Sequence, residues 1–154
     1  MQTYEHRQPL ARWISALMAA VMALFFYLSF ALSSDPVVPW VPALAIAILL
    51  GTWWMVSVLI TRVDEQSVSW SFAWGWPGGR IPLARIDRAQ RTELNLLERG
   101  SAGLHWTIWH GWLWNVSGAQ AVELLLTGGT RITIGTDDPQ GLLDAIERFR
   151  RGAA

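Results

Sequence analysis

Histidine and carboxylate side chains are the residues of this chain best suited to catalysis or metal binding. The sequence has three histidines and no cysteine. His105 and His110 are five residues apart in a segment predicted as strand, so we expect them on opposite faces, unable to bind one metal ion together. Capping of a following helix accounts for Asp137 and Asp138. We therefore predict no catalytic residue, no metal site, no cofactor and no enzymatic activity.

Four arginines lie in one short stretch and could contact the phosphates of lipid headgroups. They are Arg80, Arg85, Arg88 and Arg91, with Asp87 as the one acidic residue among them. A domain held at an anionic leaflet gains about 1 kcal/mol for each basic residue near the lipid. The alternation of a strand would divide the four between two faces, which favours solvated charges with local ion pairs. Both interpretations stay open.

Tryptophan is unusually frequent, with 11 residues in the chain. One small core cannot bury all the indoles that follow residue 63. Those predicted for the core are Trp70, one of the pair Trp106 and Trp109, and Trp114. The others are expected to lie partly exposed in the headgroup layer or on a protein-binding face, where an amphipathic ring is favoured. The candidates for such contacts are Trp74, Trp76 and Trp112.

The part of the chain that carries these residues has the pattern of a small β domain. From Val68 to Trp76, large apolar residues alternate with small ones, and this period of two predicts a half-buried strand. Further strands are expected at residues 80–83, 86–94, 104–110, 112–117, 121–127 and 130–135. Residues 95–103 lack periodicity and are predicted as a loop. About seven antiparallel strands indicate a bent sheet or an open barrel.

One amphipathic helix is predicted at the C-terminal end of this domain. Asp138 can cap it, Pro139 suits its first position, and Gly152 follows its last turn. Its apolar stripe consists of Leu142, Leu143, Ile146 and Phe149. We expect this stripe to close the open end of the sheet.

Two long uncharged runs precede the domain, at residues 13–32 and 37–61. Each has at least the roughly 20 helical residues that cross a hydrocarbon core of about 30 Å. We predict two membrane-spanning helices joined by a tight turn at residues 33–36. The expected organisation is a cytoplasmic N-terminal tail (1–12), a two-helix transmembrane hairpin (13–62) and a cytoplasmic domain (63–154). The tryptophans expected at the inner interface are Trp13, Trp53 and Trp54.

Charged residues beside these runs predict their orientation. Arg7 and Arg12 precede the first run and Arg62 follows the second, whereas the turn carries only Asp35. Because basic flanks stay in the cytoplasm, both termini are expected there. Cleavage of the first run as a signal peptide near residues 31–33 is the alternative. Its length and the second run directly after it favour a retained helix.

The order of these segments resembles that of bacterial membrane proteins with a pleckstrin-homology-like (PH-like) domain. The matching pieces are Arg-Ile-Pro-Leu-Ala-Arg-Ile at 80–86, Gly-Thr-Asp-Asp-Pro at 135–139, and residues 115–118 and 121–124. The resemblance covers about residues 63–151. It implies a PH-like barrel in a bacterial inner-membrane protein of a family without an assigned activity. The hairpin at 74–80 carries one arginine, which argues against the inositol-lipid recognition of eukaryotic PH domains.

The predicted fold class is a membrane α-hairpin of two transmembrane helices plus an all-β PH-like barrel with one C-terminal capping helix. We expect a non-catalytic, membrane-anchored interaction or scaffold module, acting as an accessory subunit or assembly factor of a larger membrane complex. The alternative is a lipid-headgroup-sensing domain at the cytoplasmic leaflet. The expected partners are the bilayer, another membrane protein and anionic lipid. Residues 63–154 hold 9 Arg against 10 Asp and Glu, a net charge of −1, which argues against binding of nucleic acid.

Overall fold

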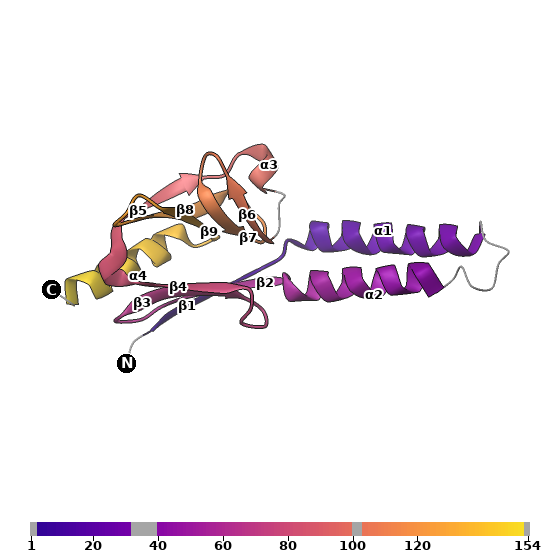
Figure 1. The fold of residues 1–154 in the computed structure, drawn as a ribbon, viewed down its shortest axis with the longest axis horizontal. Coiled ribbons are helices and arrows are strands. Elements are labelled where there is room, and N and C mark those ends of the chain that lie inside the picture. Colours follow the sequence, from indigo (N-terminus) through magenta and orange to yellow (C-terminus); the bar gives the residue numbers. More distant parts are fainter. Residues whose placement is uncertain (1–2, 32–39, 100–102, 153–154) are drawn as a thin grey trace.

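Two helices project side by side from one end of a β-rich domain in the computed structural model of this chain (Figure 1). The structure describes residues 3–31, 40–99 and 103–152. The helices are α1 (Arg12–Ala31), α2 (Trp40–Met55), α3 (Leu96–Arg99) and α4 (Pro139–Gly152), with a 3₁₀ turn η1 (Leu83–Arg85). The strands are β1 (Tyr4–Pro9), β2 (Val58–Val63), β3 (Ser67–Phe72), β4 (Gly78–Pro82), β5 (Ile86–Glu93), β6 (Gly103–Thr107), β7 (Gly111–Asn115), β8 (Gln120–Leu126) and β9 (Arg131–Gly135).

The strands form two sheets that face each other. Sheet A has the order β1-β2-β3-β4, and sheet B has the order β5-β8-β9-β7-β6. All neighbours are antiparallel except β7 and β9, which are parallel. The core lies between the sheets and α4: Trp70 of β3 packs edge-on against Trp114 of β7, with 5.9 Å between ring centroids. A β-rich domain with a C-terminal helix is consistent with the sequence prediction.

Helix α4 begins and packs as its sequence predicts. The Asp138 side chain accepts a hydrogen bond from the Gly141 N–H at 2.9 Å, which caps the first turn. Leu142 and Ile146 are completely buried against the sheets. The sequence is sufficient to predict this helix because capping and apolar spacing are both local signals.

The predicted fold class is wrong in its two transmembrane helices. Among the described residues, the helix over Arg12–Ser29 is the one long and apolar enough to cross a membrane, by length and composition. The 16 residues of α2 extend about 24 Å, short of a hydrocarbon core of about 30 Å. The end of the second uncharged run is not helical, because Val58–Val63 pairs with β1 and β3 as a strand. The turn predicted at 33–36 lies outside the described residues.

Strand β1 replaces most of the predicted N-terminal tail. Tyr4–Pro9 pairs with β2 along its whole length and forms an edge of sheet A. The Tyr4 hydroxyl donates to Asp138 at 3.0 Å, and His6 bonds to Asp137, so β1 is tied to the start of α4. Together, β1 and β2 bring the described strands to nine, in two sheets, where about seven are expected from the sequence.

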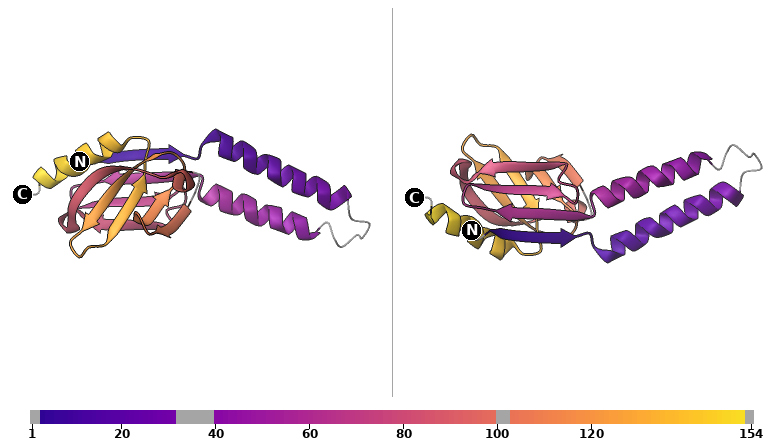
Figure 2. Two further views of the ribbon diagram at one scale, coloured as in Figure 1. Left: turned by 90° about the horizontal axis from the view of Figure 1, so that it is seen from above. Right: turned by 90° about the horizontal axis from the view of Figure 1, so that it is seen from below.

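The helix pair continues directly from sheet A and packs against its core. The chain passes from β1 into α1 and returns from α2 into β2. The Leu10 N–H donates a hydrogen bond to the Ser57 carbonyl at 2.7 Å, which joins the two connections. Ile14, Trp53 and Val56 pack against the core cluster. Both views in Figure 2 show the pair leaving the same end of the domain. These contacts fix the direction of the helices relative to the sheets.

Candidate interaction surfaces

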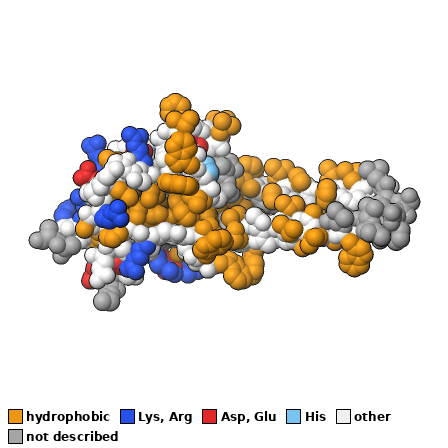
Figure 3. Space-filling model, viewed as in Figure 1, with side chains coloured by type: hydrophobic (Ala, Val, Ile, Leu, Met, Phe, Trp, Pro, Cys, Tyr) orange, Lys and Arg blue, Asp and Glu red, His pale blue; other side chains and the backbone are white. Residues whose placement is uncertain are grey.

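Helices α1 and α2 expose apolar side chains over most of their surface. The exposed residues include Leu17, Val21, Leu24 and Phe25 of α1, and Leu44, Ile48 and Leu49 of α2. In the space-filling view, hydrophobic side chains extend along the described part of the pair (Figure 3). Each Å² of apolar surface left in water costs about 25 cal/mol. Burial of this surface in lipid or against other protein would therefore be favourable.

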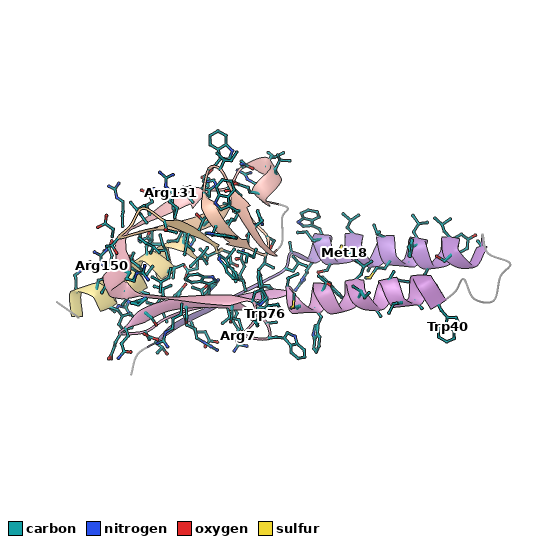
Figure 4. All side chains as sticks on the ribbon, in the orientation of Figure 1. Arg7, Met18, Trp40, Trp76, Arg131 and Arg150 are labelled. Atoms are coloured by element: carbon teal, nitrogen blue, oxygen red, sulfur yellow. The ribbon has the colours of Figure 1, made fainter. Side chains whose placement is uncertain are left out.

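Three tryptophans gather where α2 meets the domain, and we call Trp54, Trp74 and Trp76 the junction cluster. Trp74 and Trp76 lie in the turn between β3 and β4 and are largely exposed. The Trp54 and Trp74 rings pack edge-to-face, with 4.2 Å between their centroids. With Gly51 and Met55 the cluster lines an open apolar pocket, and Figure 4 shows Trp76 beside the base of α2. Tryptophan is enriched at the membrane–water interfaces of membrane proteins, near the ends of their spanning helices.

A second apolar surface is a groove between the two sheets. It lies on the side of the domain where β4 ends sheet A and β6 ends sheet B. We call it the inter-sheet groove. Its apolar lining consists of Trp70, Ile81, Leu104, Trp112, Trp114 and Ile132. A band of hydrophobic side chains crosses this part of the domain in Figure 3. Edge strands present unpaired backbone groups to which another strand can bond.

Strand register explains why the groove is open. Trp106, Trp112 and Ile132 lie directly opposite one another across β6, β7 and β9, so they share one face of sheet B. The next row, with Trp114, is covered by sheet A, and Trp114 is only 7% exposed. The outer row extends past this cover, because Trp106 is 61% and Trp112 46% exposed. Sheet B thus has an exposed apolar row beside the core.

The core tryptophans are only partly those predicted. Burial of Trp70 and Trp114 is confirmed, at 4% and 7% exposed. Burial of one member of the pair Trp106 and Trp109 is wrong, because both are exposed. The physical reason is that sheet A covers the row with Trp114 but not the outer row with Trp106.

The three predicted contact tryptophans fall on two different surfaces. Trp74 and Trp76 belong to the junction cluster, whereas Trp112 lies in the inter-sheet groove. The structure thus separates residues that the sequence presents as one set of candidates.

The predicted arginine cluster is dispersed. Arg80 lies on β4 of sheet A, Arg85 in η1, and Arg88 and Arg91 on β5 of sheet B. Arg88 and Arg91 are three residues apart in one strand, so they point to opposite faces. Arg80 donates to Ser67 at 2.8 Å and pairs with Asp64 at 3.4 Å. On the side shown in Figure 3, arginine side chains lie mainly on the half of the domain away from the helices.

The residues with catalytic chemistry are engaged in structural contacts. His110 Nδ1 lies 3.1 Å from a carboxylate oxygen of the buried Glu98, and its Nε2 lies 3.4 Å from the Thr92 hydroxyl. Burial acts to raise the pKa of Glu98, but hydrogen bonds from His110 and the Asn95 N–H outweigh it, so the pKa is lowered. Burial lowers the pKa of His105. Glu98 belongs to α3, inside the segment predicted as a loop.

Metal-binding geometry is not found in the described ranges. Across residues 3–31, 40–99 and 103–152, no three His, Cys, Asp or Glu side chains are grouped closely enough to hold a metal ion. Asp138 caps α4 and accepts from Tyr4, and burial together with this bond raises the pKa of Tyr4.

Several surface residues have no counterpart among the sequence candidates. Leu104 and Ile132 complete the groove, but they come from two strands that are distant in sequence. Trp106 lies opposite Trp112 and adjoins the groove. Leu96 and Leu97 of α3 are exposed outside both surfaces. The alternation of Leu104 and Trp106 is the one signal that could have placed these two residues on a common face.

Comparison with known proteins gives no family for this chain. No protein-family model matches the sequence, and the search of curated proteins finds no match. The resemblance to PH-like proteins therefore stays a prediction.

Proposed function

We propose that this protein is a non-catalytic, membrane-attached interaction module that binds a partner protein in its inter-sheet groove. One observation carries the proposal: apolar surface is left uncovered at the helix pair and at the groove, and a packed junction joins the two. In this interpretation the chain serves as an accessory subunit of a larger membrane complex.

Attachment to a membrane is supported by the apolar helix pair and by the tryptophans at its base. Exposed leucines and phenylalanines of α1 match the hydrocarbon interior. The junction cluster matches the headgroup layer, where indole rings are favoured. Arg7, Arg12 and Arg62 all lie on the domain side of the helices, which favours a cytoplasmic location of the domain.

Binding of an extended segment is supported by the chemistry of the groove. The free edges of β4 and β6 offer backbone donors and acceptors to an added strand. Trp106 and Trp112 offer large apolar contact area, and tryptophan is enriched among the residues that dominate binding energy. The occupant that fits best is an extended apolar segment of another membrane protein.

Photo-crosslinking tests this proposal in cells that naturally make the protein. A photoreactive amino acid replaces Trp112 in one variant and Leu97, which is exposed outside the groove, in the other. We expect a discrete adduct with one membrane protein from position 112 and none from position 97, and peptide mapping should assign the adduct to an apolar extended segment. Equal adducts from both positions, or none from position 112, would contradict the proposal.

A further inference from the structure

The outer face of sheet A carries two arginines on either side of a serine. Arg62 of β2 lies directly opposite Ser69 of β3, and Ser69 lies directly opposite Arg80 of β4. Directly opposed residues in antiparallel strands share one face. Both guanidinium groups and the hydroxyl are therefore on the solvent side of the sheet, away from the core.

These three residues border an open hollow that continues toward the helix junction. Ser71, Gly75 and Gly78 line its other end. The hollow measures about 460 Å³, within the range of about 300–1,000 Å³ common for small-molecule sites. Arg7 also belongs to this face, because it lies opposite Ile60 beside Ser71, and it extends from sheet A in Figure 4.

Intramolecular bonds hold both arginines in place and leave them donors to spare. Arg62 Nε pairs with Glu5 at 2.8 Å. Arg80 donates from Nε to Ser67 at 2.8 Å and pairs with Asp64 at 3.4 Å. A guanidinium group has five N–H donors, so several remain on each side chain. Both arginines are more than half exposed, and with Arg7 they outnumber the two carboxylates.

The polar hollow shares a hairpin with the apolar junction cluster. Gly75 lines the hollow, while its chain neighbours Trp74 and Trp76 line the pocket against Gly51 of α2. Ser69 lies two residues from Ser71, or about 7 Å along the strand. A cationic site thus directly adjoins an aromatic site at the base of a membrane-facing helix, which suits a ligand with one anionic and one apolar end.

We propose that this face binds an anionic glycerophospholipid. Its phosphate lies between Arg62 and Arg80 and accepts a hydrogen bond from Ser69, and an acyl chain lies against Trp74, Trp76 and α2. The charge and bidentate geometry of arginine suit phosphate oxygens. This inference rests on the proposed membrane attachment and does not require a partner in the inter-sheet groove, although Arg80 also borders that groove. It involves Arg80 but not Arg85, Arg88 or Arg91.

The test measures lipid binding to the full-length protein in neutral detergent micelles. Native mass spectrometry follows the titration with phosphatidylglycerol, with phosphatidylcholine and inorganic phosphate in separate arms. The test variant is Arg62→Gln/Arg80→Gln. The matched control is Arg88→Gln/Arg91→Gln, which removes the same charge from β5 of the other sheet. Carbonate extraction of the wild type from membranes separately measures attachment, so that the two proposals can fail independently.

We expect the wild type to retain phosphatidylglycerol in preference to phosphatidylcholine. The Arg62→Gln/Arg80→Gln variant should bind about 30-fold more weakly, as expected for the loss of two basic residues near a lipid phosphate. The β5 control should bind as the wild type does. Equal weakening in both double variants, no weakening in either, or displacement of the lipid by an equal concentration of inorganic phosphate would overturn the inference.

Discussion

Glu98 illustrates at the residue scale how one buried carboxylate organises a surface segment. Its carboxylate accepts from the Asn95 N–H at 3.1 Å and contacts His110, which joins α3 to the turn between β6 and β7. Asn95 in turn caps α3, accepting from the N–H groups of Leu97 and Glu98. The segment 95–99 has no apolar periodicity, so the spacing of Asn95 and Glu98, which is that of a capping box, is the local signal for this helix.

The bonds to Glu98 predict a pH-dependent contribution to stability. Since the pKa of Glu98 is lowered in the folded protein, its contribution is complete above the ordinary value of 4.5 and is lost as pH falls through the lowered value. Glu98→Gln should therefore reduce the free energy of unfolding by about 1–3 kcal/mol at pH 7. The deficit should shrink as the pH falls below 4.5.

Thermal unfolding followed by circular dichroism in detergent, at pH 7 and pH 3, measures this effect. Glu93→Gln is the control, because Glu93 is an exposed carboxylate on the neighbouring strand β5. A Glu98→Gln deficit of the same size at both pH values would argue against the ionised carboxylate as its cause.

At the element scale, α4 could be predicted from the sequence and β2 could not. Asp138, Pro139 and the apolar stripe of α4 are signals within one segment. Val58–Val63 instead prolongs an uncharged run, and periodicity alone does not distinguish a short apolar strand from a helix. Its partners are β1, which pairs with it over separations of 49 to 59 residues, and β3. The pairing with these two strands, which the sequence does not specify, makes this segment a strand.

The contribution of α4 to the core can be measured by truncating one buried side chain. Leu142 is completely buried between α4 and the sheets, so Leu142→Ala should lower the free energy of unfolding by about 2–5 kcal/mol. Arg148→Ala, on the exposed side of the same helix, should change it by about 0.5 kcal/mol or less. Urea unfolding of both variants in detergent tests the comparison, and equal stabilities would show that α4 does not close this core.

At the scale of the whole molecule, the junction determines how the domain is presented. Ile14, Trp53 and Val56 pack against the core of the domain, so the helix pair and the sheets share one packed junction. The groove could not be predicted because its apolar row on sheet B depends on the parallel pairing of β7 with β9, which local alternation does not specify. Trp112 was the one apolar residue of the groove that the sequence indicated as a contact candidate.

The proposed membrane attachment places the junction at a membrane surface and the far end of α4 away from it. Because the chain contains no cysteine, Ala73→Cys beside the junction cluster and Arg150→Cys in α4 can each be labelled with one fluorophore. In reconstituted vesicles, spin-labelled lipid headgroups should strongly quench the label at position 73 and leave the label at position 150 almost unaffected. Equal quenching at the two positions, or none at position 73, would contradict the claim.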